Sequence, residues 1–214
     1  EQERDRNEFY RVSKEYQNSI ENSVMERLFV LRATQGIFNS SMFVTRDEFT
    51  TYTELYLNRV PGVRALCWVP GVTEKERDAL EINARRDGFE SYQIIEPGGR
   101  EHPVAAATRA CYFPVFYVEP YSGNASLLGH DVSALPPIRN ILRKARDEDR
   151  ILALPNGILQ HAGMYSDTDS LVLFVPVYTP GTVTYTLEGR RKNLEGYVMG
   201  IFRFSDMVPK AFPG

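Results

Sequence analysis

Three histidines could carry acid–base chemistry or bind a metal ion in this 214-residue chain. His102, His130 and His161 are scattered over turn-like segments, and none is spaced with a second ligand in a zinc-binding pattern. His130 is followed by an acidic residue, Asp131, and this pair is typical of a loop histidine beside a capping aspartate. The histidines therefore predict no metal site.

Motifs for nucleophilic or cofactor chemistry are missing from the sequence. It contains no nucleophile elbow, no phosphate-binding Walker loop and no dinucleotide fingerprint. We therefore expect no catalytic residues, no cofactor and no enzymatic activity. A secreted hydrolase whose residues have no local signature is the alternative, and turnover of generic ester or phosphate substrates would support it.

The composition is that of a soluble globular domain. Hydrophobic residues make up 43% of the chain, and 25 basic against 28 acidic residues give a net charge of −3. A nucleic-acid partner would need a basic excess, so none is expected. The longest apolar stretch, residues 171–178, is too short to span a bilayer, and the charged N-terminus EQERDRNEFY has no signal-peptide core. Any targeting or anchoring segment is expected to lie outside this sequence, if there is one.

The two cysteines, Cys67 and Cys111, lie in apolar, strand-like surroundings. Buried free thiols are common in such positions, and a domain of this size does not need a covalent staple. Free thiols are therefore expected, and a disulfide in an oxidising compartment is the alternative.

The elements that must position any site begin with a long helix. Apolar residues recur every three or four positions from Phe9 to Met42, and only Gly36 interrupts the stripe. A helix of about 40 residues would be about 60 Å long, which exceeds a compact domain of this size. We expect this helix to pair with its counterpart in a second subunit as a parallel homodimer. The alternative is a helix packed wholly against its own sheet.

Shorter helices and strands follow. Thr45 with Glu48 and Thr73 with Glu76 form capping boxes that predict two helix starts, and the pair Pro136-Pro137 predicts a third helix, over residues 136–147. Strand-forming segments are expected at residues 63–69, 91–96, 109–119, 151–154, 158–162, 171–178 and 194–204, with turns at 97–99 and 156–157. Helices followed by an antiparallel sheet predict an α+β fold.

The loop before the third helix contains Asn124, Gly129 and Asp131. Glycine can adopt a positive φ, and an aspartate can accept hydrogen bonds from free backbone amides. We expect a structural role for all three. Asp131→Ala should then cost about 1 kcal/mol, the usual effect of a lost cap, and leave ligand affinity almost unchanged.

Several short motifs, in this order and spacing, resemble the CHASE domain, the extracytoplasmic sensory domain of histidine kinases, diguanylate cyclases and related receptors. They are Trp68-Val69-Pro70, Glu76-Arg77, Gly88, Tyr92, Tyr112-Phe113-Pro114-Val115, Glu119-Pro120, Asn124, Leu128-Gly129, Asp131, Arg139, Ala145, Ile158-Leu159-Gln160 and Pro176-Val177-Tyr178.

The resemblance implies a PAS-like antiparallel sheet flanked by helices. Residues 1–44 would form a stalk and dimerisation helix and residues 45–204 the ligand-sensing module. Residues 205–214 would lead toward a membrane-proximal part. The function implied is that of a sensor in a membrane-anchored receptor, periplasmic or extracellular, which binds a small molecule and transmits the signal through the N-terminal helix.

The resemblance also suggests where the ligand binds. Plant members hold an adenine-type cytokinin through an aspartate and a threonine, and the matching positions here are Ala110 and Ala153. We expect a pocket between the sheet and residues 127–131, lined by Ala110, Tyr112, Leu128 and Ala153. Such an apolar wall disfavours cytokinins and favours a smaller or more apolar molecule. The alternative is a dimerisation module without a ligand, its pocket filled by Phe116, Leu127, Leu128 and Phe174.

Overall fold

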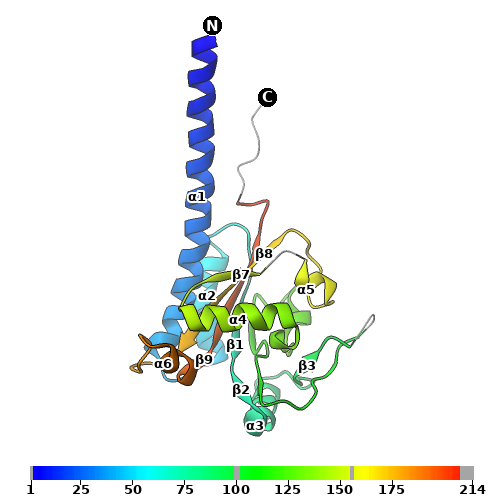
Figure 1. Cartoon of the computed structure of the whole chain (residues 1–214). Helices are drawn as coiled ribbons and strands as arrows, with labels where there is room; N and C mark the ends of the chain where they lie inside the picture. Colours follow the sequence, from blue (N-terminus) through cyan, green and yellow to red (C-terminus); the bar gives the residue numbers. More distant parts are fainter. Residues whose placement is uncertain (1, 99–101, 155–156, 208–214) are drawn as a thin grey trace.

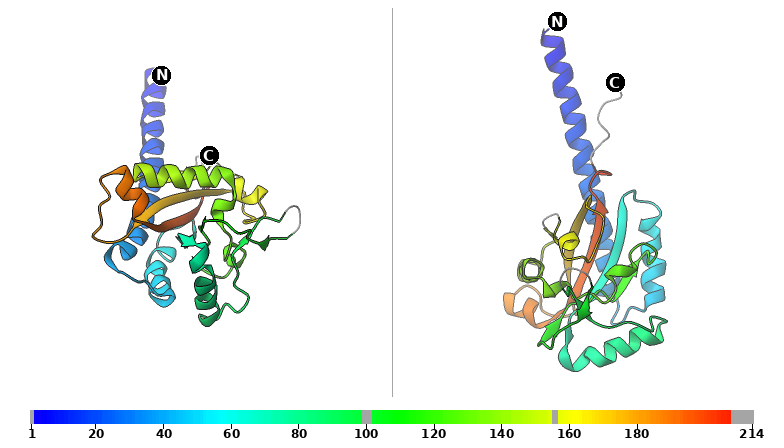
Figure 2. Two further views of the ribbon diagram at one scale, coloured as in Figure 1. Left: turned by 60° about the horizontal axis from the view of Figure 1, so that its bottom comes forward. Right: turned by 90° about the vertical axis from the view of Figure 1, so that its right-hand side faces the viewer.

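The protein is an antiparallel sheet between two layers of helices, as seen in the computed structural model, which describes residues 2–98, 102–154 and 157–207 (Figure 1 and Figure 2). The five-stranded sheet has the order β6-β1-β9-β8-β7, and all its neighbouring strands are antiparallel. Its strands are β1 (Val63–Pro70), β6 (Tyr117–Glu119), β7 (Leu152–Leu154), β8 (Ser170–Tyr178) and β9 (Leu194–Arg203). The predicted α+β fold with a long N-terminal helix is confirmed.

The long helix, α1, runs from Gln2 to Ser40 and has two different parts. Its C-terminal part packs on β8 and β9, where Leu31 and Phe38 are buried. Its N-terminal part extends beyond the sheet (Figure 1), and Phe9 is 69% and Ile20 36% exposed there. The helix is therefore longer than its own domain can cover.

Both predicted capping boxes are present. Thr45 and Glu48 begin α2 (Arg46–Leu57), and Thr73 and Glu76 begin α3 (Glu74–Arg86). In each, the glutamate accepts a hydrogen bond from the backbone amide of the threonine. The third predicted helix is α4 (Pro136–Glu148), with proline in its first turn because the missing amide hydrogen costs nothing there.

Two apolar cores lie on the two faces of the sheet. One core joins α1 and α2 to the sheet through residues such as Phe38, Phe49 and Trp68. The other joins α4 to the sheet through Ile138, Leu142 and Phe174. The left panel of Figure 2 shows α4 on the face of the sheet opposite α1.

Some predicted strands are wrong or shorter than expected. Residues 158–162 are not a strand; they include the short helix α5 (Ile158–His161), which buries Leu159. Only β3 (Ile95–Glu96) forms in the segment 91–96, and it pairs with β4 (Val104–Ala105). The segment 109–119 divides into β5 (Cys111–Tyr112), which pairs with β2 (Val72–Thr73), and β6.

Further differences come from elements that the sequence did not reveal. The helix α6 (Leu187–Lys192) was not expected. Two 3₁₀ turns, η1 (Ala125–Leu127) and η2 (Val132–Ala134), occupy the loop before α4. The expected turns at 97–99 and 156–157 lie partly outside the described residues. No helix in the described part of the chain is long and apolar enough to cross a membrane.

Candidate functional site

The loop from η1 to α4 is held between two strand segments. The backbone amide of Ile95 donates to Gly129 O at 2.9 Å, and that of Asp131 donates to Ile95 O at 2.8 Å. On the other side, Val115 N donates to His130 O at 3.0 Å and Gly129 N to Val115 O at 2.9 Å. The segment 129–131 therefore serves as a short additional strand that joins β3 to the chain before β6.

Asp131 is at the centre of this region and is fully buried. Its Oδ1 accepts hydrogen bonds from Phe113 N at 2.9 Å, Ser133 N at 2.9 Å and Ser133 Oγ at 2.6 Å. Its Oδ2 lies 3.2 Å from a guanidinium nitrogen of Arg109, which also forms an ion pair with Glu96. These contacts brace the loop before α4, and the purely structural role expected for Asp131 stays a prediction.

Asn124 and Gly129 are also used in building the loop. The Asn124 side-chain amide donates to Arg64 O at 3.0 Å and to Pro120 O at 2.8 Å. Gly129 has a φ of +84°, and a Cβ at this position would lie 2.4 Å from Gln93 O. The close approach and the positive φ both require glycine here.

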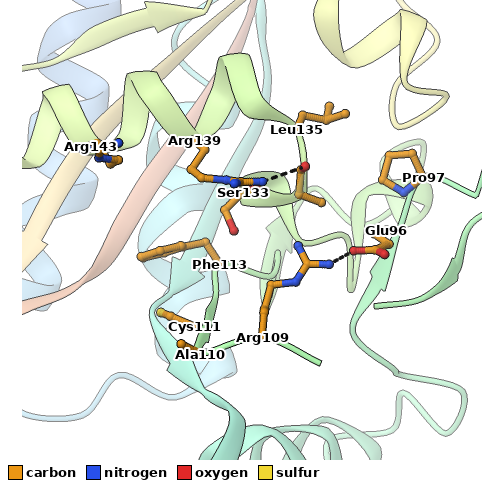
Figure 3. A pocket seen from close by; sticks show the side chains of 11 residues that line it. Glu96, Pro97, Arg109, Ala110, Cys111, Phe113, Ser133, Leu135, Arg139 and Arg143 are labelled. Carbon is orange, nitrogen blue, oxygen red and sulfur yellow. Dashed lines mark hydrogen bonds and ion pairs between the residues drawn. The ribbon is translucent and has the colours of Figure 1, made fainter. Parts of the chain in front are cut away.

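A cavity of about 690 Å³ opens beside this loop, between α4, β5 and the end of β3 (Figure 3). Four charged residues line it, namely Glu96, Arg109, Arg139 and Arg143. An apolar part is provided by Pro97, Ala110, Phe113 and Leu135. The cavity combines positive charge with a small apolar surface, and this differs from the apolar wall expected from the sequence.

The four residues expected to line a pocket have different surroundings. Ala110 is exposed and lines this cavity, whereas Tyr112, Leu128 and Ala153 are not among its lining residues. Tyr112 is buried, and its hydroxyl contacts Glu74 and Ala107 O. Leu128 is half-buried between the two cores, and Ala153 is exposed on the edge strand β7. Their role in ligand binding stays a prediction.

The arginines were not predicted as site residues. Arg109 lies 13 residues from Glu96 and 22 from Asp131, so the network that holds it is non-local. Arg139 and Arg143 are spaced by four on α4, which places them on one helix face. In the sequence, the only local pattern that indicated these two arginines was their spacing of four in the helix predicted to begin at Pro136.

The histidines and cysteines form no reactive cluster among the described residues. His130 is buried, burial lowers its pKa, and its Nδ1 has no hydrogen-bond partner in the described part of the structure. Cys67, which is buried, and Cys111, which is exposed, are both free, as expected, and desolvation around each sulfur raises the pKa of its thiol. No group of three or more potential metal ligands is found within residues 2–98, 102–154 and 157–207.

The chain is similar to known proteins over most of its length. The CHASE domain model matches residues 42–213. A curated relative, the hybrid signal transduction histidine kinase A of Dictyostelium discoideum, is 24% identical over 205 residues, which are 94% of this chain. The match spans only 10% of the length of that relative. Because the family model covers most of the chain, from α2 through the whole sheet, this protein belongs to the CHASE domain family.

Proposed function

We propose that this chain is the extracytoplasmic sensory module of a membrane-anchored signalling receptor. In this proposal it binds a small molecule and passes the signal to the rest of the receptor through α1, and it has no catalytic activity of its own. The family and the similarity to a signal transduction histidine kinase support the proposal. The observation that carries it is the geometry of α1, which is part of the core at one end and free of the domain at the other.

Contacts in the C-terminal half of α1 couple this helix to the sheet. The Gln35 side-chain amide donates to Pro176 O in β8 at 2.5 Å, and the Phe38 ring stacks on Trp68 of β1 with centroids 4.0 Å apart. Arg27, only 3% exposed, donates to Pro61 O at 2.6 Å and to Asp206 O at 3.3 Å. A shift of the sheet on ligand binding would therefore move the helix, provided that the ligand prefers one arrangement over the other.

The projecting part of α1 supports pairing between subunits. Phe9, Val12 and Ile20 lie on one face of the helix at spacings of three and eight residues, and the domain does not cover Phe9 or Ile20. In a parallel homodimer each of these faces would bury the other. A change in the sheet of one subunit could then alter the helix pair.

Site-directed disulfide cross-linking tests this pairing. In a Cys111→Ser background, Ile20→Cys should give a covalent dimer under mild oxidation, because the two copies of residue 20 face each other. Asn18→Cys is the matched control, since residue 18 is also exposed to solvent but lies about 200° away around the helix. Equal cross-linking at both positions, or none at Ile20→Cys at high protein concentration, would contradict the pairing.

A dimerisation module without a ligand is the second candidate, and one observation favours it. Leu127 and Phe174, two of the expected filling residues, are completely buried in the core between the sheet and α4. A ligand therefore cannot enter that core without displacing side chains. Native mass spectrometry of the purified chain separates the candidates, since a retained small molecule would favour the sensor.

A further inference from the structure

The charges around the cavity beside α4 are unevenly paired. Arg109 is 25% exposed and shares its charge with two carboxylates, those of Glu96 and Asp131. Among the described residues, Arg139 donates only to backbone oxygens, to Ser133 O at 2.9 Å and Ala134 O at 3.2 Å. Arg143 has no hydrogen-bond or ion-pair partner in the part of the chain that the structure describes. Two lining guanidinium groups therefore have no carboxylate partner among the described residues.

The nearest acidic residues on α4 are already engaged. Asp147, one turn after Arg143, pairs with Arg191 at 2.6 Å and with Arg146 at 2.7 Å. Hydrogen bonds from these two arginines hold the pKa of Asp147 below its usual range. Glu148 pairs with Arg150 at 3.5 Å and Lys144 at 3.9 Å. Both carboxylates about one turn beyond Arg143 are thus paired with other basic side chains.

Two like charges four residues apart on one helix face repel each other. Arg139 and Arg143 have this spacing, and both side chains line the cavity (Figure 3). An anion bound in the cavity would offset this repulsion and accept charge-assisted hydrogen bonds from the guanidinium nitrogens that backbone oxygens do not already occupy. Arginine suits this role because its planar donors match a carboxylate.

We propose that this cavity binds a small organic carboxylate, with Arg139 and Arg143 as the carboxylate-binding residues. This inference rests on the proposed sensory function and specifies its ligand class. The carbon skeleton of the ligand would contact Phe113 and Leu135, which supply the apolar part of the lining. Desolvation around its sulfur raises the pKa of Cys111, so its thiol adds no negative charge to that of Glu96.

Binding at this site would connect two parts of the fold. Arg139 and Arg143 belong to α4, which packs on β7 and β8, whereas Phe113 follows β5. A ligand held between them would bring α4 toward the segment that Asp131 fixes. Since β8 also contacts α1, the site is one strand away from the helix proposed to transmit the signal.

Calorimetric titration of the 214-residue chain at low ionic strength tests the proposal. The probes are acetate, succinate and glutarate, with succinamide as the uncharged analogue and inorganic phosphate as a competing anion. We expect at least one carboxylate to bind and succinamide not to bind. Arg143→Gln should lower the affinity for that carboxylate about tenfold or more, which is the usual effect of losing a charge-assisted hydrogen bond.

Lys144→Gln is the matched control, because it removes the same charge from the adjacent helix position, which does not line the cavity. The carboxylate affinity of the Lys144→Gln variant should stay within about twofold of that of the unsubstituted protein, because the Lys144 charge is exposed to solvent. Equal losses in both variants would overturn the proposal in favour of non-specific attraction, and so would absence of binding by all three carboxylates. Tighter binding of phosphate than of every carboxylate would overturn the assigned ligand class.

The outcomes for the ligand and for the sensory function can be told apart. If Ile20→Cys cross-links but no carboxylate binds, the assigned ligand class is contradicted and the pairing of α1 is retained. Carboxylate binding that depends on Arg143, with no pairing of α1, would instead retain the site and contradict transmission through a helix pair.

Discussion

Replacing Gly129 by alanine is expected to be among the most damaging single changes in the domain. The residue has a φ of +84°, and an added Cβ would lie 2.4 Å from the carbonyl oxygen of Gln93. We expect a loss of about 4 kcal/mol, combining roughly 1–3 kcal/mol for a side chain at positive φ with roughly 1–3 kcal/mol for displaced backbone. Urea unfolding followed by circular dichroism would measure it.

Gly123→Ala separates the two contributions. Gly123 has nearly the same φ, +85°, but apart from its two chain neighbours no described residue has an atom within 4 Å of the position that a Cβ would take. Its substitution should cost about 1 kcal/mol, because only the backbone conformation is penalised. Similar losses in the two variants would show that the close approach of Gln93 has little effect on stability.

Local signals made the helical part of the fold predictable. The stripe in α1 repeats within every turn, and each capping box needs only two residues three positions apart, such as Thr45 and Glu48. The long strands β8 and β9 were also predicted nearly to the residue, since β8 is a nearly continuous apolar run and β9 is rich in apolar and aromatic residues. None of these patterns needs information from distant residues.

The segment 158–162 shows where local patterns become ambiguous. A short apolar run suits either a buried strand or one turn of helix. Here the amide of Met164 donates to Leu159 O at 2.9 Å, and Leu159 is buried in the core beneath α4. Burial of this one side chain against distant residues, rather than the local sequence, determines the helical turn.

The helix α6 was missed for a related reason. It has six residues and contains Gly189, so its intrinsic helical preference is weak. Contacts with α4 hold it in place: Arg190 donates to Asp147 O at 2.9 Å, and Arg191 pairs with the Asp147 carboxylate at 2.6 Å. The sequence separations are 43 and 44 residues, too long for a pattern to reveal.

The candidate site was only partly predictable. The resemblance placed Ala110 at a ligand pocket, and Ala110 does line the cavity. It did not reveal that Arg109 turns toward Glu96 and Asp131, or that the arginines of α4 reach the same space. The charge of a cavity depends on which side chains meet after folding, and no single segment of the sequence contains that information.

Asp131→Ala should destabilise the domain more than a lost cap would. The aspartate is fully buried and accepts from Phe113 N, Ser133 N and Ser133 Oγ, so alanine would leave three donors without their acceptor. Buried donors without partners cost roughly 1–3 kcal/mol each, and local rearrangement recovers part of this, so we expect about 3 kcal/mol. The value expected from the sequence was about 1 kcal/mol, because only the cap was visible there.

Asp131→Asn is the matched comparison, because the amide oxygen can still accept from Phe113 N and Ser133 while the ion pair with Arg109 is lost. Arg109 keeps Glu96 as its partner and is 25% exposed, so the loss should be only about 1 kcal/mol. Chemical denaturation of both variants measures the two values. If Asn and Ala were equally destabilising, the ion pair with Arg109 rather than the hydrogen bonds to the loop would be the main contribution of Asp131.

Because Asp131 does not line the cavity, carboxylate affinity in Asp131→Asn should change far less than in Arg143→Gln. A large loss of affinity with unchanged stability would instead identify Asp131 as a ligand contact.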